Sequence, residues 1–133
     1  FGCDISGVPL PLGVTPIELS QISSADVVCF FDSLEHFVDP GAAIRNLDTT
    51  FVFISVPNCY YESREWFENV YRHLRRGEHL HHFNEVTLDN FFAHNGYERV
   101  GHTFNHEDVI RKNPTCDGFN ILCALYRRII ITA

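Results

Sequence analysis

The strongest pattern in the chain is a pair of apolar runs that each stop at a polar cluster. Residues 27–31 are apolar without a break and include β-branched and aromatic side chains. Residues 51–56 form a second, largely apolar run that stops at Pro57-Asn58. Runs of this length without alternation indicate strands covered on both faces, as in a parallel sheet. We therefore predict two buried strands.

A helix is predicted between these two strands. Asp39 can accept a hydrogen bond as the N-cap, Pro40 suits the first helical position, and an apolar face continues to about Leu47. Sixteen residues separate Asp32 from Thr49, and a crossover between parallel strands needs at least about 10–12 residues. The unit is therefore strand, helix, strand, with a right-handed crossover.

The second half of the chain is predicted to add one helix and two strands. Asn84 can cap the helix, and Gly96 can end it in the left-handed conformation. The buried stripe of this helix is expected to consist of Val86, Leu88, Phe91 and Phe92. Residues 97–104 and 120–131 read as strands joined by the polar loop 105–118, so they can pair antiparallel. The fold class is α/β, with parallel strands and a C-terminal antiparallel edge hairpin.

A segment between the second strand and the later helix mixes aromatic with charged residues. Its aromatic side chains are Tyr60, Tyr61, Trp66, Phe67 and Tyr71. We expect residues 60–74 to form a helix or a lid over the sheet edge. Plain packing on the sheet is the alternative to a lid that covers a ligand.

The charge and composition of the chain limit the classes of partner that we expect. The chain has 10 basic and 17 acidic residues, a formal net charge of −7, and such a surface repels phosphate backbones. We therefore expect no nucleic-acid partner, with a local basic patch left open at Arg72, Arg75 and Arg76. No apolar run approaches the length needed to cross a bilayer, so no membrane association is expected. Residues 120–131, as an exposed edge strand, would allow a homodimer.

Cysteine usage and length bear on compartment and domain count. The five cysteines form no C-x-x-C pair, which favours a reducing, cytoplasmic location. A chain of 133 residues with 45% hydrophobic residues fits one domain with an ordinary core. The first residue is Phe1, and residues 1–5 read as the tail of a strand already under way. We expect a single domain over residues 1–133 that is truncated at its N-terminus, a fragment of a longer protein.

Three segments together resemble class I S-adenosylmethionine-dependent methyltransferases. Residues 26–40, with DSLEHF followed by DP, resemble that family's fourth strand and the loop after it. Residues 53–58 (FISVPN) resemble its fifth strand, and residues 79–84 (HLHHFN) resemble the stretch that leads toward its sixth strand. The match is closest to the branch of ubiquinone-pathway O-methyltransferases and sugar-cluster enzymes. It implies a partial Rossmann-like methyltransferase sheet.

One motif of that family is absent. The chain contains no G-x-G-x-x-G arrangement, and this glycine-rich turn is what lets backbone amides approach the cofactor closely. Residues 1–5 can be the end of the family's second strand, which would make Asp4 the acid that binds the ribose hydroxyls. The stretch from Asp4 to Ala25 is short for the elements that normally follow.

The resemblance implies S-adenosylmethionine as cofactor and, in the complete protein, methyl transfer to an oxygen or nitrogen of a small-molecule acceptor. It places the cofactor at the end of the first predicted strand. The residues assigned to cofactor binding are Asp4, Phe31, Asp32, Ser33, Leu34 and Glu35. For Asp32, capping of the turn after the strand is the structural alternative.

Three histidines are candidate catalytic groups. A general base with a pKa near neutral suits an alcohol, phenol or amine acceptor. His36 is the first candidate, and His79 and His81, which point the same way in an extended loop, are candidates on the opposite rim. Each has a structural alternative: His36 can hold its loop through a hydrogen bond, and the other two can be solvated or position a helix.

Two other readings stay open. Because the absent glycine turn removes part of the cofactor cradle, the chain can be a non-catalytic remnant or half-domain that does not bind cofactor. A third reading is a metal-binding domain around residues 79–82, since a His-x-His pair with Glu35, His36 or Glu78 nearby can ligate zinc. The family resemblance already accounts for these histidines, so we assign no metal ligand from the sequence.

Overall fold

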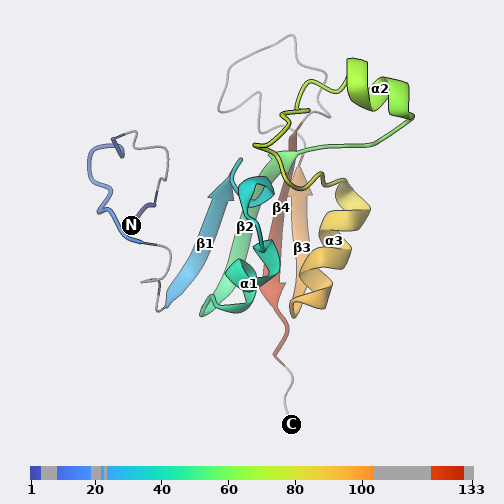
Figure 1. Ribbon diagram of the computed structural model, residues 1–133. Helices are drawn as coiled ribbons and strands as arrows, with labels where there is room; N and C mark the ends of the chain where they lie inside the picture. Colours follow the sequence, from blue (N-terminus) through green and yellow to red (C-terminus); the bar gives the residue numbers. More distant parts are fainter. Residues whose placement is uncertain (4–8, 19–21, 23, 104–120, 131–133) are drawn as a thin grey trace.

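In the described residues, four strands form one mixed sheet with the spatial order β1-β2-β4-β3 (Figure 1). The strands are β1 (Ala25–Phe31), β2 (Thr49–Pro57), β3 (Tyr97–Thr103) and β4 (Ile121–Arg128). β1 and β2 are parallel, with Val27 opposite Phe51, which confirms the predicted strand-helix-strand unit. β4 runs antiparallel to both β2 and β3. The computed structural model describes residues 1–3, 9–18, 22, 24–103 and 121–130.

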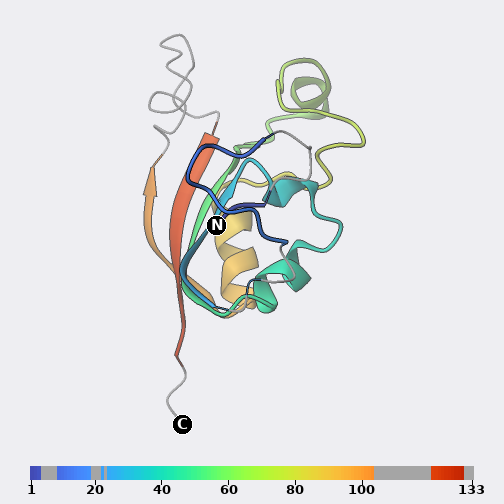
Figure 2. The same ribbon diagram turned by 90° about the vertical axis from the view of Figure 1, so that its left-hand side faces the viewer.

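The helices of the described residues lie on one side of this sheet, with η2, α1 and α3 against its face (Figure 2). They are the 3₁₀ helix η2 (Leu34–His36), α1 (Pro40–Arg45), α2 (Arg64–Asn69) and α3 (Glu85–His94). α1 and α3 cover the sheet face, whereas α2 lies beyond the carboxyl ends of β1 and β2 (Figure 1). The segment expected to be a helix or lid therefore contributes only the short α2, placed above the end of the sheet.

Local capping explains where the two predicted helices begin and end. Asp39 Oδ1 accepts a hydrogen bond of 2.8 Å from the Ala42 amide at the start of α1. At α3, Asn84 and Thr87 each accept a hydrogen bond from the other's backbone amide at 2.9 Å. Gly96 follows α3 with φ +84°, a conformation that favours glycine. These cap predictions are confirmed.

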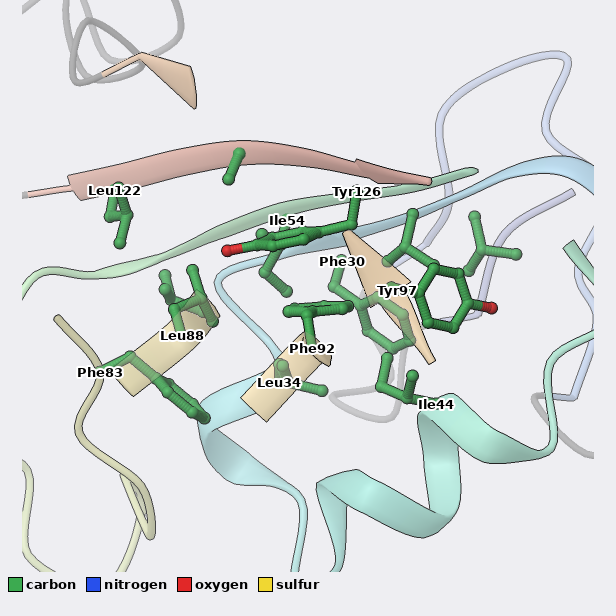
Figure 3. Packing of buried hydrophobic residues seen from close by; sticks show 14 of the residues in the cluster. Phe30, Leu34, Ile44, Ile54, Phe83, Leu88, Phe92, Tyr97, Leu122 and Tyr126 are labelled. Atoms are coloured by element: carbon green, nitrogen blue, oxygen red, sulfur yellow. The ribbon is translucent and has the colours of Figure 1, made fainter. Parts of the chain in front are cut away.

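The core lies between the sheet and the helices α1 and α3. Phe92 of α3 is fully buried and stacks on Tyr126 of β4, with ring centroids 3.9 Å apart (Figure 3). Leu34 and Ile44 close the same cluster from η2 and α1. One predicted core residue is wrong: Val86 is 67% exposed, because α3 turns Leu88 and Phe92 toward the sheet and leaves Val86 outside.

The position of β4 corrects a second prediction. β3 and β4 form the expected C-terminal antiparallel hairpin at one edge of the sheet, but β4, which was expected to be the exposed edge strand, lies inside the sheet and pairs with β2 on one side and β3 on the other. The backbone groups of β4 are thus used on both sides, so β4 does not offer the free edge for pairing two copies that was expected of residues 120–131. In the described part of the chain, the edges of the sheet are β1 and β3.

Some predictions concern residues that the structure does not describe. Asp4 and the loop 105–118 lie outside the described residues.

Cys3, Cys29, Cys59 and Cys123 carry free thiols. A search of the described helices finds none with the length and apolar character that a membrane span requires.

Candidate functional site

The first part of the candidate site is the turn at the carboxyl end of β1. The Asp32 amide donates to the Ser55 carbonyl at 2.9 Å, and the Ser55 hydroxyl donates to Asp32 Oδ1 at 2.9 Å. Asp32 has φ +46°, in the left-handed region that costs a non-glycine residue about 1 kcal/mol. The two hydrogen bonds to β2 hold the turn in this conformation and fix where its carboxylate lies.

The residues around Asp32 separate into exposed and buried ones. Phe31 is 56% exposed, with its ring centroid 5.7 Å from that of Phe53 on β2. Ser33 is half-buried and makes no side-chain capping bond to η2. Leu34 is fully buried in the core. Of the five consecutive residues assigned to cofactor binding, Phe31, Asp32 and Ser33 have side chains that can reach a ligand at this strand end.

The histidine loop is bound to η2, so the two sequence motifs form one site. The Glu35 carbonyl accepts hydrogen bonds from the amides of Leu80 at 2.8 Å and His81 at 3.1 Å. His36 Nδ1 bonds the Glu78 carbonyl at 2.9 Å, and His81 Nε2 bonds the Phe37 carbonyl at 2.9 Å. The His81 ring is therefore used to hold the loop.

Glu35 is the unusual group in this site. Its side chain is only 1% exposed, and neither carboxyl oxygen has a hydrogen-bond partner in the described part of the chain. Burial raises the pKa of Glu35 to about 7, although its own backbone amide and the His36 ring act in the opposite direction. His36 Nε2 lies 3.9 Å from Glu35 Oε1.

His79 completes this group from the opposite loop. Its ring packs edge-on against the His36 ring, with centroids 4.7 Å apart. Burial, followed by the nearby His36, lowers the pKa of His79, so the neutral ring is favoured. Glu35, His36 and His79 each offer one ligand atom, and these atoms all lie within 4.8 Å of one another.

A buried tyrosine near this group was not assigned to the site from the sequence. Tyr71 is 8% exposed, and burial, with smaller effects of Cys59 and Glu35, raises its pKa. His82 packs edge-on against the same ring, with centroids 5.6 Å apart, and burial lowers the pKa of His82. Tyr71 was grouped with the aromatic residues of a lid, and no sequence signal marks it as the one that turns inward.

Comparison with known proteins identifies the family. The family model described as a methyltransferase domain matches residues 14–102, which include both the β1 turn and the histidine loop. The chain belongs to this methyltransferase-domain family. No curated protein matches the sequence significantly.

Solved structures share the fold of this methyltransferase domain at low sequence identity. A chain of the complex between the Haloferax volcanii Trm112 methyltransferase activator and a methyltransferase matches 87% of this chain, with 14% identity and a TM-score of 0.58. Magnesium protoporphyrin IX methyltransferase (ChlM) from Synechocystis PCC 6803, solved with bound SAH, matches 86%, with 16% identity and a TM-score of 0.53. The chain spans 61% and 50% of the lengths of these two proteins.

A third comparison bears on the predicted partners. The small RNA methyltransferase HEN1 matches 86% of this chain over 15% of its own length, with 16% identity and a TM-score of 0.52. The expectation of a small-molecule partner with nucleic acid excluded is therefore wrong, because this fold occurs in an RNA methyltransferase and in a complex with a protein activator. Net charge was a poor guide, since it averages over the surface, and Arg75 and Arg76 are exposed next to the histidine loop.

Proposed function

We propose that the protein transfers a methyl group from S-adenosylmethionine to an oxygen or nitrogen atom of its acceptor. The observation that carries this proposal is the family match over residues 14–102, which covers both the turn after β1 and the histidine loop. Ligands of open α/β sheets bind at the carboxyl ends of the strands. The presence of SAH in the related ChlM structure supports the same cofactor class here.

The polar, half-buried groups at the end of β1 are assigned to the cofactor. The Asp32 carboxylate, held by Ser55, suits the positively charged sulfonium or amino group of the cofactor, and Ser33 can add a hydroxyl contact. Methyl transfer is an in-line displacement, so holding donor and acceptor in line supplies much of the rate acceleration. A rigid turn tied to β2 meets that requirement better than a free loop.

Removal of the acceptor's proton is assigned to the histidine pair, His36 and His79. His79 is kept in its neutral form by burial, so one ring nitrogen can accept a proton at neutral pH. His36 lies against it, edge to face. His81 is assigned a positioning role, because its Nε2 is bonded to the Phe37 carbonyl.

Titration calorimetry with S-adenosylmethionine and SAH tests cofactor binding. Asp32→Asn, which tolerates the left-handed backbone, should weaken binding at least tenfold. Asp26→Asn, at the other end of the same strand, is the matched control and should leave binding unchanged. Equal weakening by both variants would remove Asp32 from the cofactor site.

Transfer of a radiolabelled methyl group tests the activity itself. The assay should offer small organic acceptors, RNA and protein, because relatives of this fold include an RNA methyltransferase and a protein-bound enzyme. His36→Ala should lower turnover while sparing cofactor affinity. Unchanged turnover would show that His36 takes no part in the reaction.

A half-domain that does not bind cofactor is the second candidate. It is favoured by the missing G-x-G-x-x-G motif and by β1, whose outer edge has no partner strand in the described part of the chain. The same calorimetry separates the two candidates. No heat and no thermal shift with millimolar SAH would favour the half-domain.

A further inference from the structure

We propose that Glu35, His36 and His79 bind a divalent first-row transition-metal ion, with zinc as the best match. One ligand atom from each of these side chains lies within 4.8 Å of the others. Two of the donors come from η2 and one from the histidine loop, and backbone hydrogen bonds join these two segments. The inference goes beyond methyl transfer and stands on the geometry of these three side chains.

The buried carboxyl group of Glu35 is the first observation in favour of a metal ion. An ionised carboxyl group that is removed from water without hydrogen bonds destabilises the fold unless a cation or a proton compensates it. Glu35 is 1% exposed and lacks a hydrogen-bond partner for either oxygen in the described residues. Its Oε1 faces His36 Nε2 at 3.9 Å. A cation between these two atoms would compensate the carboxylate.

The second observation is the way each histidine uses its two ring nitrogens. The Glu78 carbonyl can only accept a hydrogen bond, so His36 Nδ1 carries the proton and the neutral ring keeps a lone pair on Nε2, the atom that faces Glu35. His79 bonds the His73 backbone, while its Nδ1 is buried with no hydrogen-bond partner among the described residues.

This pairing is the arrangement that metal-binding histidines require. In metal sites the second ring nitrogen usually donates to a carbonyl or carboxylate, which fixes the tautomer and orients the ring. In this site both histidines have one nitrogen engaged by backbone and a lone pair left over. The carboxylate and the two lone pairs are acceptors only, so none of the three can satisfy another without a proton or a metal ion.

The donor types and spacing select the class of metal. Two imidazoles with one carboxylate suit zinc and its neighbours, whereas magnesium and calcium prefer oxygen ligands throughout. Zinc holds these donors at about 2.0–2.2 Å, which places them roughly 3.4 Å apart in a tetrahedron. The 3.9 Å between His36 and Glu35 needs only a small side-chain rotation. His36 is 34% exposed on its side chain, so the ion can enter from solvent.

Three protein donors leave at least one coordination position open. Structural zinc sites are closed by four protein ligands, whereas sites with three keep a position for water or substrate. This site is of the open kind. A metal ion would occupy the lone pairs of His36 and His79, so these rings would then act as ligands, and neither would be a free base.

The test is titration of the whole chain with Zn²⁺, and separately with Co²⁺, after purification without a histidine tag and stripping with EDTA. We expect one ion per chain, and visible absorption bands of low-coordinate Co²⁺. Glu35→Gln and His79→Gln should each lower the affinity at least tenfold. The control variants are His82→Gln in the same loop and His94→Gln at the exposed end of α3, and both should leave affinity unchanged.

Three outcomes would overturn the site: no stoichiometric binding, affinity unaffected by Glu35→Gln and His79→Gln, or equal losses in the two control variants. Circular dichroism in EDTA identifies a variant that does not fold, and in that case the Co²⁺ spectrum of the other variant decides. Titration of the same stripped protein with SAH keeps this proposal separate from the proposed function. Metal binding without SAH binding would remove the proposed function and leave the metal site. SAH binding without metal binding would remove the metal site and leave the proposed function.

Discussion

Replacing Glu35 by glutamine should change how the stability of the metal-free protein depends on pH. Folding raises the pKa of this buried carboxyl from its usual 4.5 to about 7. Ionising it therefore costs the folded state about 3 kcal/mol more than the unfolded state. The protonated form stabilises the fold fully below pH 4.5, and this contribution is lost as the pH rises through 7. Glutamine has no proton to lose and removes this pH dependence.

The size of the effect follows from the two pKa values. About 1 kcal/mol of the contribution is already lost at pH 5 and nearly all of it at pH 8. The free energy of unfolding of Glu35→Gln, relative to the parent, should thus rise by about 2–3 kcal/mol between these two pH values. Any constant offset from burying the amide cancels in that comparison.

Urea unfolding in EDTA, followed by circular dichroism at pH 5, 6, 7 and 8, measures this difference. Glu65→Gln, on the exposed surface of α2, shows what loss of a surface negative charge does to the same profile. If the Glu35→Gln difference stayed constant from pH 5 to 8, the argument from burial would be refuted, and Glu35 would have to be solvated or paired in solution.

The remaining predictions concern the fold that carries the site, and urea unfolding measures each of them. Phe92→Ala should lower the free energy of unfolding by about 3–5 kcal/mol because it removes a buried ring from the core. Val86→Ala, on the exposed side of α3, should lower it by less than about 0.5 kcal/mol. Similar losses for the two variants would contradict the orientation of α3. Gly96→Ala should lower the free energy of unfolding by about 1 kcal/mol. The loss comes from backbone strain alone, since an added Cβ meets nothing within 4 Å. Unchanged stability would contradict the positive φ of Gly96. Arg128→Lys should cost roughly 1–3 kcal/mol, because lysine cannot reproduce the bonds to the Thr49 carbonyl and the Tyr97 hydroxyl; full stability would show that these bonds are dispensable.

Much of the fold could be predicted because local patterns and tertiary structure agree. The apolar pattern of residues 27–31 predicts a strand by itself, and these residues form β1 in the sheet. Asp39 and Asn84 cap their helices through backbone amides only three residues away. Val86 was mispredicted because helical periodicity defines an apolar arc and not which edge of that arc meets the sheet. The pairing of β4 with β3 was predicted, but the place of β4 inside the sheet was not, because spatial strand order need not follow chain order.

The candidate site was predicted in its residues more than in their environments. The motifs around Glu35 and His79 were predicted to lie near each other at the carboxyl end of β1, and backbone hydrogen bonds join the two segments there. Nothing local indicates that Glu35 is buried, since glutamate is ordinarily exposed; its burial results from the loop that bonds its carbonyl. The histidine tautomers depend equally on distant carbonyls at Glu78 and His73, which only the folded chain brings into contact.

The insertion of β4 between β2 and β3 has a consequence for how this domain acquires its structure. Among the described residues, β4 is the last strand along the chain, yet it is the strand that joins β3 to the β1–β2 pair. During synthesis, the three earlier strands emerge before the one that connects them, so β3 and α3 must wait without a partner sheet. Pairings over such long sequence separations slow folding and leave apolar strands open to aggregation in the meantime. Chaperone dependence of expression would be a natural result of this strand order.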